Sequence, residues 1–475
     1  MDDRSVVIGV DSSTQATKAL AVDVAMGTVL GRGRAAHVVS GGGRRESYPE
    51  QWWTALGAAL AQTGYAGSAA AVSVGGQQHG LVALDAAGEA VHPALLWNDV
   101  RSAPQARALV ERLGPAEWAR RTGSVPDASF TAAKWAWLTA DEPRAAARVR
   151  RVMLPHEYLT WRLTGVQVTD RGDVSGTGWW GHGIYDLEIL GLIGLDEALL
   201  GRVAQPGETV GGALAGSPLR PGMLVGTGTG DNMAAALGLG LEPGVPVLSL
   251  GTSGTVYAVT RGRPADPTGT VAGFADALDG WLPLACTLNC TQAVDRVAGW
   301  LGIDREAAEP GGEVVLLPYF DGERTPKLPF ASGLVTGLRH DTTPGQILGA
   351  AYEGAAMSLL TAVDLVLAAG GESSAPDEPL VLIGGGARGA AWLTTVRRLS
   401  GRPVLVPEAG ELVALGAAAQ AAALITGERA DAVARRWHTR DGTLYDPVPA
   451  DDDAVARIAR VGRLAGALLE PGDHG

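Results

Sequence analysis

Residues 6–18 read VVIGVDSSTQATK, in which a short apolar run ends in a carboxylate, a hydroxyl-rich turn and a lysine. An apolar run with a polar turn directly after it is typical of a buried strand. The segments 19–23 and 28–31 continue as short strands with a Met-Gly turn between them, so we expect an antiparallel meander. From residue 48 onwards helix and strand patterns alternate, which predicts an α/β sheet covered by helices.

A second stretch of this kind lies in mid-chain, where residues 246–259 read PVLSLGTSGTVYAV. Its turn, residues 251–254, coincides with residues 11–14 when the two stretches are laid over each other. Two such units suggest two domains of related fold that face each other, and a chain of 475 residues is too long for one core. Two unrelated hairpins are the alternative, because such turns are common.

Turn-forming residues at positions 240–244 mark the predicted boundary between these domains. We therefore predict an N-terminal domain over residues 1–242, a C-terminal domain over 243–450, and a C-terminal helix and tail over 451–475. The turn-rich end of the chain, residues 470–475, is expected to fray.

The overall composition narrows the class of partner. A net charge of −13 argues against nucleic acid, because phosphate neutralisation needs a basic face. The most apolar stretches are short and rich in alanine, which predicts no membrane partner. The N-terminus lacks the pattern of a secretory signal, so we expect a cytoplasmic protein. The chain has three lysines, Lys18, Lys134 and Lys327, and each lies in or beside one of the motifs described below.

The first motif is the turn that follows Asp11. A carboxylate at a strand end, small hydroxyl residues such as Ser13 and Thr14, and Lys18 together suit Mg²⁺ and a polyphosphate. Asp11 can hold the metal through water, the hydroxyls and turn N–H groups can face phosphate oxygens, and the lysine adds charge. The sequence has no Walker A pattern here, and a solvated hairpin turn is the alternative.

The second motif, residues 226–232, reads GTGTGDN and precedes a helix of small residues. Glycines let a substrate approach the backbone closely, and the dipole at a helix start favours the carboxylate of Asp231. This carboxylate could accept the proton of a substrate hydroxyl as the oxygen attacks a γ-phosphate. An ordinary N-cap is the alternative, because Asp often fills that position.

The third motif, residues 384–389, reads GGGARG and lies between a predicted strand and a predicted helix. It matches G-x-G-x-x-G, and Glu408 follows at about the distance of a ribose-binding acid. By itself this motif favours an NAD-dependent oxidoreductase. A nucleotide that places its adenosine and phosphates against the same helix start uses the same physics.

The fourth motif, residues 76–80, reads GQQHG and is followed by WNDVR at residues 97–101. Their amide, imidazole, carboxylate and guanidinium groups offer many donors and acceptors with little apolar surface, as a polyol site requires. For His79 alone, a structural histidine is the alternative.

Taken in order, these segments resemble the FGGY family of carbohydrate kinases, and most closely its xylulose kinases. The similarity runs over nearly the whole chain. The segments that carry it are residues 76–80 (GQQHG), 97–101 (WNDVR), 130–135 (FTAAKW), 230–232 (GDN), 249–254 (SLGTSG), 317–326 (LPYFDGERTP) and 384–392 (GGGARGAAW).

The resemblance implies two domains of the actin/hexokinase (ribonuclease H-like) type, with the active site in the cleft between them. It implies Asp231 as the general base and Asp11 near Mg²⁺ and the β- and γ-phosphates. The binding residues that it implies are Gln78, His79, Asp231 and Asn232 for the sugar, and Ser13, Thr14, Thr252, Gly385, Gly386 and Ala387 for the nucleotide.

We therefore expect ATP-dependent phosphorylation of D-xylulose to D-xylulose 5-phosphate, with ATP and Mg²⁺ as cofactors. A kinase for another pentulose or polyol is the alternative within the family. The oxidoreductase and a nucleotide-binding protein without catalysis are the alternatives from other classes. The resemblance also suggests a homodimer, although no sequence feature demonstrates one.

Overall fold

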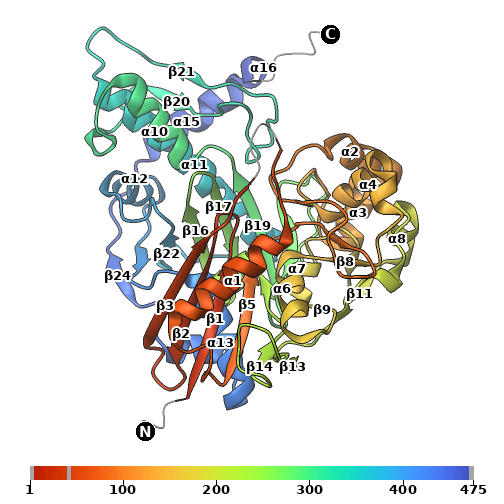
Figure 1. The fold of residues 1–475 in the computed structure, drawn as a ribbon. Coiled ribbons are helices and arrows are strands. Elements are labelled where there is room, and N and C mark those ends of the chain that lie inside the picture. Colours follow the sequence, from red (N-terminus) through yellow and green to blue (C-terminus); the bar gives the residue numbers. More distant parts are fainter. Residues whose placement is uncertain (1–4, 40–43, 470–475) are drawn as a thin grey trace.

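Two mixed β-sheets of seven strands each form the framework of the computed structural model, which describes residues 5–39 and 44–469 (Figure 1). The predicted tail at residues 470–475 lies outside the described residues. The first sheet consists of β1 (Val6–Ser12), β2 (Ala16–Asp23), β3 (Val29–Ala36), β5 (Ala71–Gly76), β13 (Thr209–Gly212), β14 (Leu224–Gly226) and β15 (Thr229–Gly230). The second consists of β16 (Pro246–Leu250), β17 (Gly254–Ala258), β18 (Ala272–Ala275), β19 (Trp281–Thr287), β22 (Leu380–Ile383), β23 (Val404–Pro407) and β24 (Gly442–Tyr445).

The two sheets have the same connectivity around their central hairpins. β1 pairs antiparallel with β2 and parallel with β5, as β16 pairs antiparallel with β17 and parallel with β22. Farther out, β14 pairs parallel with β5, and β13 pairs antiparallel with β14. In the second sheet β23 likewise pairs parallel with β22, and β24 pairs antiparallel with β23. The predicted meander is present, because β3 continues antiparallel to β2. The repeat seen in the sequence is therefore a repeat of topology.

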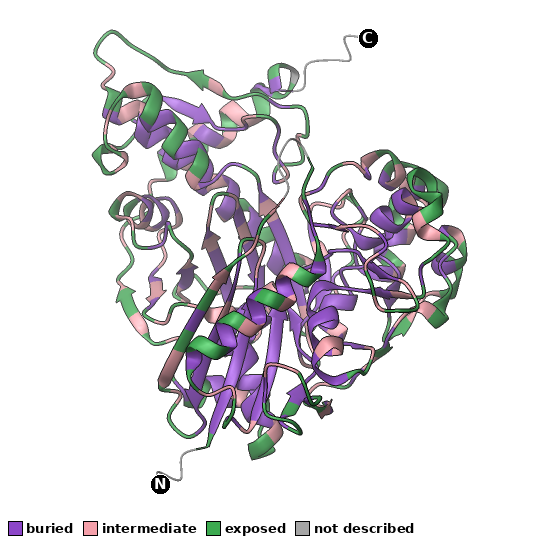
Figure 2. Ribbon diagram, viewed as in Figure 1, coloured by how far each residue is buried: buried purple, intermediate pink, exposed green. Residues whose placement is uncertain are grey.

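Each face of the first sheet packs against a helix. The helices that flank the two sheets are α1 (Pro49–Thr63), α9 (Asp231–Gly238), α11 (Pro344–Ala369), α12 (Ala390–Ser400) and α13 (Leu412–Thr426). Ile8 and Val10 join the core under α1, whereas Val7 joins a separate cluster with the alanines of α13. This alternation follows from the two-residue period of a strand. Figure 2 shows the central strands of this sheet buried, and β3 and the outer side of α1 largely exposed.

Helix α13 lies so close to β1 that a side chain at Gly9 has no room. A Cβ atom at Gly9 would be 1.9 Å from the carbonyl oxygen of Ala414. Only glycine allows such an approach of strand and helix backbones. The first sheet is therefore completed by a helix from the C-terminal part of the chain.

The second sheet has the converse arrangement. One of its faces packs on α11 and α12, and the other includes Val247 and Tyr257 in a cluster with Met233 and Leu237 of α9. Helices α9 and α13 also contact each other, because a Cβ at Gly416 would be 1.9 Å from the carbonyl oxygen of Ala234. Each half of the chain thus lends one helix to the other half. The domain bounds at residues 242 and 450 stay a prediction.

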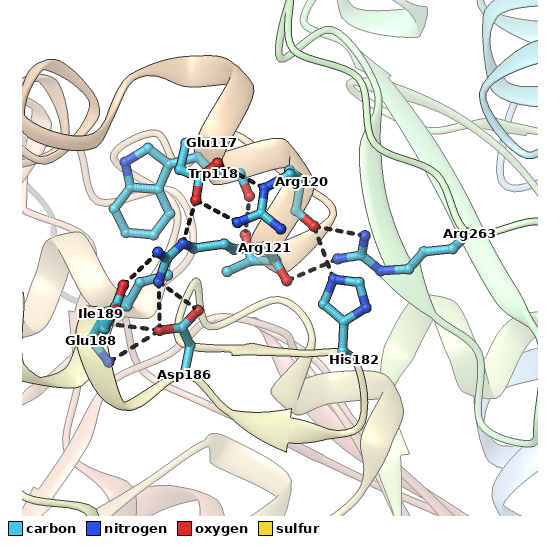
Figure 3. Close-up of polar contacts among 10 residues, drawn as sticks. Glu117, Trp118, Arg120, Arg121, His182, Asp186, Glu188, Ile189 and Arg263 are labelled. Atoms are coloured by element: carbon cyan, nitrogen blue, oxygen red, sulfur yellow. Dashed lines mark hydrogen bonds and ion pairs between the residues drawn. The ribbon is translucent and has the colours of Figure 1, made fainter.

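An accessory lobe, shown on the right of Figure 1, is inserted between β5 and β14. Its helices are α2 (Ala103–Leu113), α3 (Pro115–Thr122), α4 (Thr131–Asp141), α5 (Pro143–Ala146), α7 (Arg171–Val174) and α8 (Leu187–Ile193). Helix α6 (Pro155–Thr164) of the same insertion packs on the core of the first sheet. Figure 3 shows how Arg121 ties α3 to the start of α8 through Asp186 and Glu188, while it also pairs with Glu117 within α3.

The second half of the chain also contacts this lobe. Arg263 donates hydrogen bonds of 2.9 Å to the carbonyl oxygens of Arg120 and Arg121 at the C-terminus of α3 (Figure 3). A cation at the C-terminal end of a helix is favoured by the helix dipole. The lobe is therefore held from both halves of the chain.

The expectation that the chain contains only short apolar stretches was wrong for α11. This helix is long and apolar enough to cross a membrane by length and composition. In the structure 72% of its apolar 18-residue stretch is buried inside the fold. Leu348, Leu359 and Val366 of this helix belong to the core of the second half. Its apolarity is explained by packing, because α11 is buried against the second sheet.

Candidate active site

Asp11 lies opposite Lys18 in the register of β1 and β2. The Asp11 side chain is buried, and its Oδ2 atom is 3.6 Å from the Lys18 ammonium. Lys18 is also 2.6 Å from Oε2 of Glu411, the residue that precedes α13. The lysine thus bridges two carboxylates from distant parts of the chain.

Burial raises the pKa of Asp11 to about 6, although the charge of Lys18 opposes the shift. Its Oδ1 atom has no hydrogen-bond partner among the described residues. A buried carboxylate oxygen without a partner fits a cation that arrives with a ligand. No group of three or more His, Cys, Asp or Glu residues suited to a metal occurs in the described part of the chain. Mg²⁺ bound through one carboxylate and substrate phosphates requires no such group.

The turn after Asp11 is held by hydrogen bonds of its own side chains. The Ser13 hydroxyl donates to the carbonyl oxygen of Ala16 at 3.0 Å. The Thr14 hydroxyl donates to Oε1 of Gln77 at 3.2 Å and accepts from Nε1 of Trp97 at 3.1 Å. The first hairpin is therefore tied to the end of β5, where the fourth sequence motif begins.

Asp231 is the first residue of α9, at a helix start as the sequence predicted. It directly follows the short strand β15, where the sequence predicted only a glycine-rich loop. Its Oδ1 atom accepts hydrogen bonds from the backbone N–H of Asn232 at 2.9 Å and from Nδ2 of the same residue at 3.1 Å. Burial, together with the negative charges of Asp11 and Asp173, raises the pKa of Asp231 to about 7. Such a carboxylate is suited to accept a proton near neutral pH.

Gln78 and His79 follow the end of β5 and are buried. Oε1 of Gln78 accepts a hydrogen bond of 2.8 Å from Nδ2 of Asn232, so the two predicted sugar residues are in direct contact. Nε2 of Gln78 has no partner among the described residues. An unsatisfied amide donor beside Asp231 fits a ligand hydroxyl.

His79 has a left-handed backbone conformation with a φ of 63°. Its Nδ1 lies 2.7 Å from the carbonyl oxygen of Gly176, and its ring stacks on Phe130 at a centroid distance of 5.2 Å. Burial, together with the charge of Lys134, lowers the pKa of His79 to about 4. The ring is therefore neutral, and with Nδ1–H donating to the carbonyl, Nε2 is left as a hydrogen-bond acceptor.

Four of the predicted nucleotide residues, Thr252 and Gly385–Ala387, lie in loops of the second sheet, whereas Ser13 and Thr14 lie in the first hairpin. The backbone N–H of Gly386 donates to the carbonyl oxygen of Leu250 at 2.9 Å, so the glycine-rich loop touches the end of β16. Thr252 is exposed in the turn after β16, and Gly385 has open space where a Cβ would stand. Ala387 is buried at the base of the loop.

Two further residues lie at this site and were missed by reasoning from the sequence. Glu411 has a φ of 55° and holds Lys18, and Tyr257 is buried with a hydroxyl that has no partner among the described residues. Burial, and after it the charge of Asp231, raises the pKa of Tyr257 well above its usual range, which indicates that the two groups are close. An acid directly before the apolar helix at residues 412–426 was a signal for Glu411, whereas nothing in the sequence distinguished Tyr257.

The three lysines have different environments. Lys18 lies in the first hairpin, and Lys327 donates to the carbonyl oxygen of Thr268 at 2.7 Å. Lys134 is fully buried and donates to the carbonyl oxygens of Ala128 and Ser129. The three lysines therefore do not converge on one phosphate site.

Two family models match the chain along most of its length. The N-terminal domain of the FGGY family of carbohydrate kinases matches residues 6–238, and the C-terminal domain of that family matches residues 247–425.

Individual relatives agree with the family models. The chain is 67% identical over 470 residues to a xylulose kinase of Streptomyces coelicolor, with 98% of this chain and 97% of that protein covered. It is 65% identical over 473 residues to a xylulose kinase of Streptomyces rubiginosus, with 98% of each covered. The solved structure of xylulose kinase from Bifidobacterium adolescentis has a TM-score of 0.84 at 33% identity, over 97% of this chain and 99% of that one. The predicted two-domain fold of the actin/hexokinase type is thereby confirmed.

Proposed function

We propose that this chain, which belongs to the FGGY family of carbohydrate kinases, transfers the γ-phosphate of ATP to the terminal hydroxyl of D-xylulose. The products are D-xylulose 5-phosphate and ADP. The family makes the protein a carbohydrate kinase that acts on a sugar and ATP, which leaves no role for the NAD-dependent alternative. The choice of D-xylulose is supported by the names of the two relatives that are 65–67% identical.

The observation that carries the mechanism is the contact of Asp231, Asn232 and Gln78 at the start of α9. The sugar oxygen attacks the γ-phosphorus, its proton passes to a carboxylate oxygen of Asp231, and the bond from the γ-phosphorus to the bridging oxygen of ADP breaks. Phosphoryl transfer needs little covalent help, so one base and correct alignment are sufficient. A base with a pKa of about 7 is poised for this step at neutral pH.

Gln78, His79 and Asn232 bind and orient the sugar in this proposal. The free Nε2–H group of Gln78 donates to one hydroxyl, and the neutral ring of His79 accepts from another. ATP lies between the two hairpins, with Ser13, Thr14, Lys18 and Thr252 near its phosphates and Gly385, Gly386 and Ala387 along the nucleotide. Asp11 would hold Mg²⁺, which would supply positive charge against the β- and γ-phosphates.

The remaining expectations from the sequence are proposed together with this activity. The active site lies in the cleft between the two domains, whose bounds are 1–242 and 243–450. The protein is cytoplasmic, and a homodimer is its proposed assembly.

Replacing Asp231 by Asn tests the proposed base. The change keeps the shape of the side chain and its contact with Asn232 but removes the proton acceptor, so kcat should fall by roughly 10²–10⁴-fold. The Kd for ATP, measured by calorimetry, should change little, because Asp231 touches the sugar side of the site. A variant that turns over at the wild-type rate would remove Asp231 from this role.

The proposed substrate is tested by a coupled assay of ADP release with pentuloses, hexuloses, glycerol and gluconate. We expect D-xylulose to give the highest kcat/KM. A higher value for another sugar overturns the substrate assignment and leaves the family membership intact, whereas ADP release with none of them contradicts the proposed activity.

A further inference from the structure

A buried histidine with two carboxylates lies behind the proposed base and has no part in the mechanism above. His156, in the first turn of α6, is fully buried. Its Nδ1 lies 2.7 Å from Oδ2 of Asp173, and its Nε2 lies 3.5 Å from Oδ1 of Asp170. Both carboxylates belong to the start of α7, where Asp170 is the N-cap. We call these three residues the His156 cluster.

The His156 cluster is bonded directly to the segment that carries Asp231. The hydroxyl of Thr229 donates a hydrogen bond of 2.7 Å to Oδ2 of Asp170. Thr229 lies in β15, two residues before Asp231 and opposite Gly75 of β5. A displacement of Asp170 is therefore transmitted to the base through one hydrogen bond and two residues of backbone.

His156 also touches both backbone segments that form the sugar side of the site. A Cβ at Gly228 would be 2.9 Å from Cδ2 of His156, and a Cβ at Gly76 would be 2.9 Å from its Cβ. Gly228 precedes Thr229, and Gly76 precedes the Gln77–His79 loop. His156 thus packs against both segments, which also pair directly with each other through Thr229 and Gly230 of β15 and the end of β5.

Within the His156 cluster the imidazolium compensates part of the negative charge. Burial opposes the charged form of His156, yet the hydrogen bond and charge of Asp173, with Asp170 and Glu157, raise its pKa to about 9. Burial raises the pKa of Asp173 to about 6, although His156 lowers it. At neutral pH the cluster therefore contains one imidazolium between carboxylates. Oδ1 of Asp173 has no hydrogen-bond partner among the described residues, so His156 is its main compensation.

We propose that His156, Asp170 and Asp173 are positioning residues that hold the Thr229–Asp231 segment and set the net charge behind the general base. This inference rests on the proposed role of Asp231. The ionisable groups that face Asp231 are Asp11, Asp173 and Tyr257, and those that face His156 are Asp170, Asp173 and Glu157. Asp173 belongs to both sets, so the charge state of His156 reaches the base through Asp173.

The charge part of the inference predicts opposite effects of two substitutions. His156→Gln leaves the charge of Asp173 uncompensated, which favours the protonated form of Asp231. Asp173→Asn removes that charge, which favours the ionised form. The acid limb of the kcat/KM profile against pH should therefore move up by about half a unit to one unit for the first variant and down by a similar amount for the second. The double variant should return towards the wild-type profile.

The profiles are measured at saturating ATP with the sugar that gives the best turnover, and thermal unfolding is followed for each variant. A purely structural role lowers Tm and the amount of active enzyme without moving the acid limb. The charge part is overturned if both single variants fold and the acid limb of each stays within about 0.2 pH units of the wild-type position.

A milder pair of variants tests the positioning part if the substitutions in the cluster prevent folding. Thr229→Val removes the hydrogen bond to Asp170 at nearly constant volume, and Thr229→Ser keeps the hydroxyl. We expect kcat to fall about tenfold in the first variant with little change in the KM for sugar, and to stay within about twofold of wild type in the second. Equal kcat in the two variants overturns the positioning part.

The outcomes distinguish this inference from the proposed function. If Asp231→Asn retains wild-type turnover, the proposed base fails and the inference fails with it. If Asp231→Asn is inactive while the acid limbs do not move and the Thr229 variants do not differ, only the inference about the His156 cluster fails.

Discussion

The hairpin of β1 and β2 places Asp11 opposite Lys18, whereas the hairpin of β16 and β17 places Leu250 opposite Gly254. The two hairpins occupy corresponding positions in sheets of the same connectivity. Their turns differ slightly in length, because residues 13–16 separate the paired Ser12 and Thr17, while residues 251–253 separate Leu250 and Gly254.

The environments of the two turns differ as much as their charges. The first turn is bound to Gln77 and Trp97, on the sugar side of the site. The second is bound by Thr291 at the start of α10 (Thr291–Leu301), whose hydroxyl donates to the carbonyl oxygen of Gly251 at 2.8 Å. The two copies thus share a topology, but only the first has the buried carboxylate, which we propose as the Mg²⁺ ligand, and the hydrogen bonds to Gln77 and Trp97. The effects of substitutions in the two hairpins should therefore differ both in the kinetic constant that changes and in the size of the change.

The largest expected difference comes from Asp11→Asn. Removal of the buried carboxylate takes away the proposed Mg²⁺ ligand and leaves Lys18 uncompensated on that side, so kcat should fall by roughly 100-fold or more. Titration of activity with MgCl₂ measures the effect, and the apparent Mg²⁺ requirement should rise. An unchanged requirement would contradict the assignment of the metal to the first hairpin.

Lys18→Met should have an intermediate effect. The cation is only partly exposed and lies between Asp11 and Glu411, so its loss leaves two carboxylates near the phosphates of ATP. We expect the KM for ATP to rise about tenfold, with a smaller change in kcat. Glu411→Gln is the matched control, because it keeps Lys18 and removes its second partner. If both variants raise the KM equally, Lys18 acts through the ion pair with Glu411 and not on the nucleotide.

The smallest effects are expected from the hydroxyl groups of the two turns. Thr252→Val removes an exposed hydroxyl of the second turn, so the KM for ATP should rise about fivefold, as the loss of one hydrogen bond implies. Ser13→Ala removes a hydroxyl that already donates to Ala16, so the KM should change less than twofold. An equal rise of the KM for ATP in the two variants would show that the hydroxyl of Ser13 contacts ATP as the hydroxyl of Thr252 does.

The sequence predicted both hairpins, the helix start at Asp231 and the strand–loop–helix setting of residues 384–389. These features depend on local patterns of apolar runs, glycines and hydroxyl residues, which survive in the fold. The resemblance to the family supplied the overall architecture, and the comparisons confirmed it. The roles of the individual site residues stay predictions.

The features that escaped prediction depend on contacts between distant segments. Helix α13 is apolar on nearly all sides, so no amphipathic stripe indicates which sheet it covers. The pairing of Lys18 with Glu411 joins residues from opposite ends of the chain. His156 stands in a helix that reads as an ordinary core helix, and its carboxylates lie in a separate short helix. Periodicity carries no information about such pairings.

The position of α13 has a consequence for how the protein is made. The face of the first sheet that includes Val7, Leu20 and Val22 packs on a helix that ends at residue 426. At about 5–20 residues per second, the ribosome needs tens of seconds to reach that helix after completing β5. Until then the nascent sheet exposes an apolar face, which is a binding surface for chaperones. A fragment that ends before residue 412 keeps this face open and should aggregate, so the N-terminal half cannot complete its folding until α13 has been synthesised.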